Sequence, residues 1–120
     1  MKEVEKNKRV PDSHEKERIV IVKHAPGTSE DSSPSKSWIS FWEENTKCKI
    51  PQRCPCCNCI ITEKNPAEGA HVFKVIDVCS PPRQKYIVPT CQKCNLKYKG
   101  NKADEGVFIV PASFLCKIPD

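Results

Sequence analysis

Two pairs of cysteines with the spacing C-x-x-C are the residues of this chain whose type and spacing most clearly predict chemistry. The first pair is Cys54 and Cys57, and the second is Cys91 and Cys94. In a four-cysteine zinc site, each such pair forms a tight turn that directs two thiolates toward one tetrahedral ion. Asn58 suits the first turn, because asparagine tolerates the left-handed backbone conformation. The sequence therefore predicts a structural Zn²⁺ bound by these four cysteines.

The chain contains nine cysteines in 120 residues, so five lie outside the two pairs. Residues 1–6 lack the apolar segment of a secretory signal, which favours reduced thiols and metal binding over disulfides. A second zinc ion is an open alternative. It would draw on the remaining cysteines and one histidine, which are Cys48, Cys56, Cys59, Cys79, Cys116 and His71.

The residues that follow the first cysteine pair predict a β-hairpin and then a helix. Residues 70–78 are rich in Val, Phe and Ile and partly alternate, which is typical of a strand. Residues 86–88 predict a second strand, which Pro89 is expected to end. Residues 90–98 predict a helix that begins at the second cysteine pair. Residues 107–110 predict a last strand.

A short aromatic helix is predicted before the cysteines, in residues 37–44. Trp38, Phe41 and Trp42 lie at positions i, i+3 and i+4, so they share one helix face. Such a face can stack on bases or dock a partner. The alternative, which we prefer, is that these rings pack onto a small core.

Composition divides the chain into two parts. Residues 1–36 are mostly polar or charged and predict a largely flexible tail and linker, with one short strand at 18–23. His24 falls in this part and is assigned no role. Residues 37–120 predict one domain that is small enough to need a metal for stability. The predicted fold class is α+β, a zinc-stabilised treble clef of knuckle, β-hairpin and helix.

The cysteine pairs, the segment GAHV at residues 69–72 and the segment CQKCN at residues 91–95 together resemble the HNH, or His-Me finger, nucleases. The chain is most similar to the zinc-containing branch, in which the second C-x-x-C runs directly into Asn. The resemblance covers roughly residues 54–100. It implies that His71 is a general base and that Asn95 holds Mg²⁺ or Mn²⁺ against the scissile phosphate.

Two positions depart from the family's pattern. Many members have Asp immediately before the His as a second metal ligand, where this chain has Ala70. The middle Asn of the pattern has no clear counterpart near residues 86–88. Some members have a small residue before the His, so an active nuclease and an inactive binding domain both stay open. His71 has two further interpretations, a zinc ligand and a buried histidine.

The net charge of +5 is concentrated beside the cysteines. Residues 37–120 hold 12 Lys and Arg against 8 Asp and Glu, whereas residues 1–36 hold 8 against 7. A run without acidic residues extends from Cys91 to Ala103 and contains Lys93, Lys97, Lys99 and Lys102. This run favours phosphate contacts with a nucleic acid, DNA more than RNA, without readout of bases. A solvated, lysine-rich helix end is the alternative.

Three functions follow from these observations. The first is a nucleic-acid-binding His-Me finger domain with metal-dependent nuclease activity. The second is a non-catalytic zinc-finger module that binds nucleic acid or protein. Both predict an intracellular protein, nuclear or cytoplasmic, with no membrane span, since no run approaches 18 apolar residues. The third is a secreted cysteine-rich effector whose leader has been removed.

Overall fold

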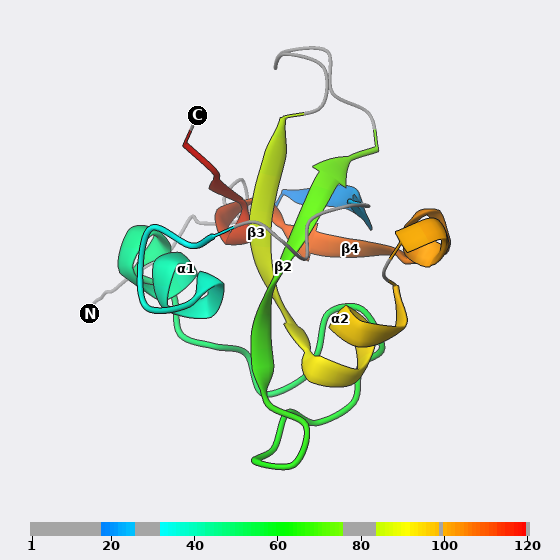
Figure 1. Cartoon of the computed structure of the whole chain (residues 1–120), viewed down its shortest axis with the longest axis horizontal. Helices are drawn as coiled ribbons and strands as arrows, with labels where there is room; N and C mark the ends of the chain where they lie inside the picture. The colour runs from blue at the N-terminus through cyan, green and yellow to red at the C-terminus, as the bar shows by residue number, and fades with distance from the viewer. Residues whose placement is uncertain (1–17, 26–31, 76–83, 99, 120) are drawn as a thin grey trace, which may run out of the picture.

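The computed structural model describes residues 18–25, 32–75, 84–98 and 100–119 (Figure 1). These residues form an α+β fold with one five-stranded antiparallel sheet of strand order β4-β1-β2-β3-β5. The strands are β1 (Ile19–His24), β2 (Ala67–Lys74), β3 (Lys85–Cys91), β4 (Val107–Pro111) and β5 (Cys116–Lys117). The helices are α1 (Trp38–Thr46) and α2 (Gln92–Lys97), and the 3₁₀ turns are η2 (Gly100–Glu105) and η3 (Ala112–Phe114). No helix in this part of the chain has the length and apolar character of a membrane span.

The predicted hairpin is present as β2 and β3, which pair from Ala67 opposite Cys91 to Phe73 opposite Lys85. One expectation about it is wrong, because β3 continues through Pro89 to Cys91 instead of ending before the proline. Proline is tolerated there because β5, the neighbour on the other side, pairs only with Tyr86 and Ile87. The missing N–H of Pro89 therefore breaks no strand pairing.

The predicted strand at 18–23 is confirmed as β1, which lies inside the sheet between β4 and β2. The folded part of the chain thus includes Ile19–His24, on the N-terminal side of the domain start that we expected at residue 37. Of the rest of the predicted tail, residues 1–17 and 26–31 lie outside the described residues, and residues 32–36 are described without a helix or strand. The short strand β5 and the two 3₁₀ turns were not predicted.

One face of the sheet carries the main apolar core. Side chains from four strands contribute to it, and Phe114 and Leu115 pack against them. The buried residues are Val22, Ala70, Val72, Tyr86, Val88, Phe108 and Val110. Since side chains alternate along a strand, residues 68, 70 and 72 of β2 lie on this face, and residues 69, 71 and 73 lie on the other.

Helix α1 packs on that second face of the hairpin, so its aromatic side chains serve the core. Ser37 caps the helix, because its side-chain oxygen accepts a hydrogen bond of 3.1 Å from the backbone N–H of Ser40. Trp42 is fully buried, and its indole N–H donates a hydrogen bond of 2.7 Å to the carbonyl of Phe114. The helix lies so close to β2 that a Cβ on Gly69 would be 2.6 Å from the backbone of Trp38. The packing interpretation of the aromatic face is confirmed.

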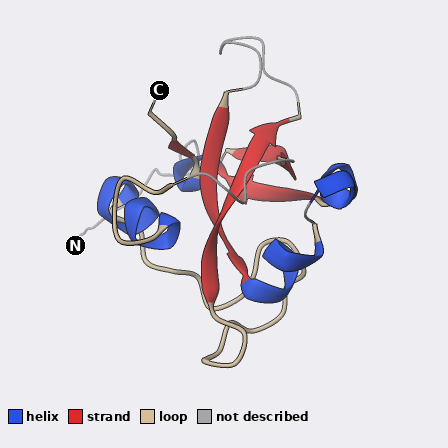
Figure 2. Cartoon of the chain, viewed as in Figure 1, coloured by secondary structure: helices blue, strands red, loops and turns tan. Residues whose placement is uncertain are grey.

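Helix α2 confirms the helix expected in residues 90–98, with shorter ends. Figure 2 shows α1 and α2 on different sides of the β2–β3 hairpin. This separation decides which of the predicted site residues can meet.

Candidate metal centre

The two C-x-x-C pairs come together at one end of the hairpin. The Sγ atoms of Cys54 and Cys94 are 3.9 Å apart, and those of Cys57 and Cys91 are 3.7 Å apart. All four sulfur atoms lie within 4.8 Å of one another. A tetrahedral zinc ion with Zn–S bonds of about 2.3 Å requires sulfur atoms about 3.8 Å apart. The four cysteines are therefore positioned to bind a metal ion, and the two shorter separations match those of a zinc site.

The first pair is held by a tight turn that the sequence anticipated. The backbone N–H of Asn58 donates a hydrogen bond of 2.7 Å to the carbonyl of Cys54, which closes the turn around Cys57. Asn58 has φ of 66°, in the left-handed region that asparagine adopts more readily than most residues. The N–H of Cys54 donates in turn to the carbonyl of Cys59 at 2.9 Å. The prediction that Asn58 adopts the left-handed conformation in this turn is confirmed.

The second pair is positioned by the junction of β3 and α2. Cys91 is the last residue of β3 and the N-terminal cap of α2, and Cys94 lies within the first turn of that helix. Asn65 fixes the junction from outside, because its side-chain oxygen accepts a hydrogen bond of 2.9 Å from the N–H of Lys93. Cys91 and Cys94 are buried, so both point inward toward the first pair.

Backbone N–H groups point to two of the four sulfur atoms, those of Cys54 and Cys91, and favour the charged form of each. The N–H groups of Cys56 and Cys91 lie 3.3 and 3.2 Å from the sulfur of Cys54. Burial alone would raise the pKa of Cys91, but hydrogen bonds from the Cys94 backbone and the Asn65 side chain outweigh burial and lower it to about 7. Burial raises the pKa of Cys54 and Cys94. A bound cation would supply the charge that lets all four lose their protons.

The other cysteines do not form a second group of this kind among the described residues. Cys116 is buried beside α1, and Cys48 has its sulfur 3.8 Å from the carbonyl of Ser113. Cys59 is exposed, and Cys79 lies outside the described residues. A second zinc ion therefore has no ligand set in this part of the chain.

His24, which the sequence analysis left without a role, is the residue that it missed beside the metal centre. It is 2% exposed, its ring lies 5.1 Å from that of Tyr98, and its Nε2 is 3.9 Å from the sulfur of Cys56. Burial lowers the pKa of His24 to about 4, so the imidazole is neutral at pH 7. The sequence contained one indication that His24 is buried. Val20, Val22 and His24 alternate along the chain, and all three face the core side of β1.

His71 and Asn95 are not brought together. His71 lies on β2 on the face covered by α1, is 7% exposed and contacts the Trp38 ring edge-on at 4.8 Å between centroids. Asn95 lies on α2, and its side-chain N–H donates a hydrogen bond of 2.9 Å to Glu68. Glu68 and His71 are three positions apart in β2, so their side chains leave opposite faces of the strand. The sheet thus separates the two residues that the family resemblance would place in one site.

Glu68 is a second residue that the sequence analysis missed. One of its carboxylate oxygens accepts from Asn95, and the other accepts a hydrogen bond of 3.0 Å from the side-chain N–H of Gln92. The carboxylate therefore fastens α2, which carries Cys94, to strand β2. No spacing rule links a strand residue to a helix 24 residues later, so only the fold reveals this contact.

The predicted basic run lies on the surface around α2. Lys93 and Lys97 are one helical turn apart and exposed, and Lys102 is exposed in η2. The ammonium group of Lys97 lies 5.2 Å from the centre of the Tyr98 ring. Lys99 is outside the described residues. No ion pair joins these three lysines to a described carboxylate.

Neither a family model, nor a curated protein, nor a solved structure matches this chain. The four-cysteine group and the surface that surrounds it are the features that indicate a function.

Proposed function

We propose that this domain is a zinc-stabilised module that binds nucleic acid through phosphate contacts and does not cleave it. The observation that carries the proposal is that exposed lysines lie on and beside the helix that supplies two of the four cysteines. A metal held by Cys91 and Cys94 would fix the orientation of that helix. Lys93 and Lys97 would then project from a rigid support.

Zinc suits the proposed structural role because four thiolates leave no open coordination position. The described core is small, so binding free energy from the metal would contribute directly to folding. The partner would be DNA more than RNA, recognised by its backbone. Each lysine that neutralises a phosphate adds to the salt dependence of binding without adding sequence preference.

The non-catalytic part of the proposal rests on the separation of His71 and Asn95. A general base must lie within hydrogen-bonding reach of the proton that it removes, and His71 is enclosed between the sheet and Trp38. On this proposal the HNH-like segments are retained for folding: GAHV as part of the hairpin, and CQKCN as the start of α2.

The test measures binding of zinc-loaded protein to labelled 20-base-pair duplexes of unrelated sequence over a range of KCl concentrations. The variant carries Lys93→Gln and Lys97→Gln. The matched control carries Lys36→Gln and Lys117→Gln, two lysines that are also exposed but lie elsewhere. We expect the slope of log Kd against log salt to fall by about 2 for the first pair, at about 0.9 per phosphate contact, and to stay unchanged for the control. Absence of binding, or equal weakening by both pairs, would reject a nucleic-acid surface around α2.

A plasmid assay with added Mg²⁺ or Mn²⁺ tests the non-catalytic part separately. We expect no nicking by the wild type above the level of a His71→Ala variant. Nicking by the wild type that is lost in a folded, zinc-loaded His71→Ala variant would instead support the nuclease function implied by the family resemblance.

A further inference from the structure

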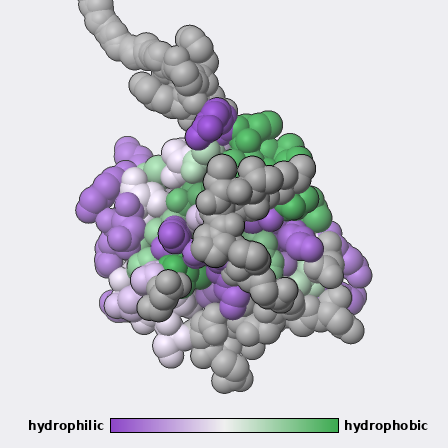
Figure 3. Space-filling view, turned by 90° about the horizontal axis from the view of Figure 1, so that it is seen from above, coloured by the Kyte–Doolittle hydropathy of each residue, from purple (hydrophilic) through white to green (hydrophobic). Residues whose placement is uncertain are grey.

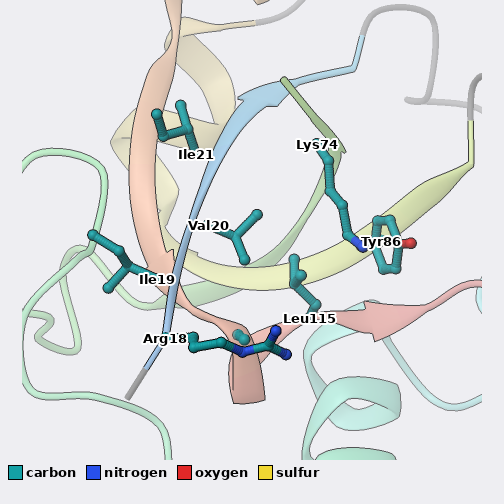
Figure 4. Close-up of a pocket in the computed structure, with 8 residues that line it drawn as sticks. Arg18, Ile19, Val20, Ile21, Lys74, Tyr86 and Leu115 are labelled. Carbon is teal, nitrogen blue, oxygen red and sulfur yellow. The ribbon is translucent and has the colours of Figure 1, made fainter. Parts of the chain in front are cut away.

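Strands β1 and β4 carry apolar side chains on both faces of the sheet. Val20 and Phe108 belong to the core on one face. On the other face, four large aliphatic side chains are exposed to 64%, 46%, 52% and 51% of their surface, and they are Ile19, Ile21, Val107 and Ile109. Figure 4 shows Val20 pointing into a hollow toward Leu115, while Ile19 and Ile21 point to the opposite side of β1.

This second face has the composition of a buried surface. An antiparallel strand with one face in water normally alternates apolar and polar residues, whereas strands buried on both faces have continuous apolar runs. Ile19–Val22 and Val107–Val110 are both continuous apolar runs. The four residues expose on the order of 400 Å² together, which is in the range of the largest apolar patch on an ordinary monomer, a patch that is often functional. Figure 3 shows hydrophobic residues gathered on one side of the molecule.

Strand β4 also has an open edge, since no described strand lies beyond it. At the two ends of the β1–β4 ladder, the N–H of Ala112 donates to Arg18 at 2.8 Å and the N–H of His24 donates to Gly106 at 3.1 Å. Even-numbered residues of β4 thus bond to β1, and odd-numbered residues direct their backbone groups outward. Val107 and Ile109 each present an N–H and a carbonyl, whereas Pro111 presents only a carbonyl.

We propose that a second copy of this chain pairs with β4 edge to edge, so that two sheets become one continuous antiparallel sheet. The two-fold axis would pass beside Phe108, with Val107 of each copy opposite Ile109 of the other. This register joins every outward N–H of Val107 and Ile109 to an outward carbonyl, which gives four hydrogen bonds. It also joins the two aliphatic rows side by side on one face.

The geometry favours a second copy over other segments of this chain. An occupant must offer an extended segment with two β-branched residues two positions apart. The backbone N–H and carbonyl groups of both residues must face β4. Residues 1–17 and 26–31 contain no such pair of side chains. Residues 76–83 contain Ile76 and Val78 but must connect β2 to β3. Reaching past β4 would span three strand spacings of about 4.8 Å from β2 and four back to β3. A second β4 meets every requirement, because the strand is complementary to itself under this symmetry.

The dimer is expected to be weak. Two aliphatic rows of the size given above bury less than the 1,200 Å² or more of stable specific interfaces. Association should therefore depend on concentration, with a Kd in the micromolar range or above. The edge lacks the charged side chains that normally prevent such pairing, because no residue of β4 is charged.

The test uses analytical ultracentrifugation of zinc-loaded protein from about 10 µM to 1 mM, together with hydrogen exchange of assigned backbone amides. We expect reversible dimerisation, with slower exchange of the Val107 and Ile109 amides at high concentration. Ile109→Lys should raise Kd at least tenfold. Ile60→Lys is the matched control, since Ile60 is 56% exposed but lies in a loop outside the sheet.

A third variant distinguishes edge pairing from stacking of the two apolar faces. Ile19→Lys adds a charge to the apolar face but not to the edge strand, so it should weaken the dimer less than Ile109→Lys. Equal weakening by the two variants, with unchanged exchange of the Val107 amide, would overturn edge pairing. A monomer at every concentration would overturn the dimer itself.

Discussion

The side chain of Asn95 donates a hydrogen bond of 2.9 Å to the carboxylate of Glu68, on the face of β2 opposite to His71. Gln92 donates to the same carboxylate one helical turn earlier. Two contacts from one short helix therefore end on one strand residue. This arrangement gives Asn95 a structural task, since it orients the helix that carries Cys94.

We predict that Asn95→Ala destabilises the domain by about 1–2 kcal/mol, because hydrogen bonds to charged groups contribute more than neutral ones. Thermal unfolding at a fixed zinc concentration would measure the change. A double-mutant cycle with Glu68→Ala is the control, and the two losses should be strongly non-additive. Additive losses would show that the contact contributes no coupling. Unchanged stability with loss of a metal-dependent nuclease activity would return Asn95 to the family's role.

The metal centre leads to a second prediction, for which the chain supplies its own control. Cys57 and Cys59 are both exposed and lie two residues apart, but only Cys57 belongs to the four-cysteine group. Cys57→Ser should lower the zinc content of purified protein well below one ion per chain and abolish cooperative unfolding, because metal binding is part of the folding free energy. Cys59→Ser should retain both. Elemental analysis and circular dichroism would measure them, and full zinc content in the Cys57 variant would contradict the ligand set.

The metal centre was predictable from the sequence because its geometry is local. A C-x-x-C turn needs only a few residues to position two sulfur atoms, and Asn58 marks the left-handed residue that closes the turn. The hairpin was predictable for a similar reason, since period-two alternation is a property of neighbouring residues. The ends of the hairpin strands were less predictable. Pro89 stays within β3 because β5 is short, and the residues around Pro89 do not reveal the length of β5.

The separation of His71 from Asn95 was not predictable from the motif. The family pattern specifies residue types and their order, and it leaves open which face of β2 each side chain takes. That face is fixed by long-range packing, namely Trp38 against His71 and Gln92 against Glu68. The role of His24 was missed because the strand that carries it was assigned to a flexible tail. Only pairing with β2 and β4, both much later in the chain, places it in the core.

The close approach of α1 to β2 gives a third prediction. A Cβ at Gly69 would lie 2.6 Å from the Trp38 carbonyl carbon and 2.7 Å from its Cβ, so the helix must move. Gly69→Ala should cost about 1–2 kcal/mol, the range for overpacking after allowing for the improved strand propensity of alanine. Denaturant unfolding at fixed zinc would measure it, and Gly69→Val should cost more. A stabilising Gly69→Ala would show that strand propensity outweighs the contact.

Burial of His24 gives the last prediction, a loss of stability in mild acid. Its pKa is lowered to about 4 in the folded protein, against about 6.5 for an exposed histidine. Between these values the unfolded chain takes up a proton that the folded chain does not, so stability falls as pH falls. The contribution is complete above pH 6.5 and decreases by at most about 1.4 kcal/mol per pH unit toward pH 4.

Metal binding by the cysteines also weakens in acid, so the measurement must separate the two effects. Unfolding should be followed from pH 7.5 to 5.5 on protein loaded with Co²⁺, whose visible absorption reports whether the metal stays bound to sulfur. His24→Gln removes the titrating group, and we expect it to lower stability at pH 7.5 while giving a flatter dependence on pH. The two slopes of stability against pH should differ by the uptake of at most one proton on unfolding. This difference should appear mainly below pH 6.5. Parallel curves for wild type and variant, with the cobalt signal intact, would show that His24 does not remain neutral in the folded protein.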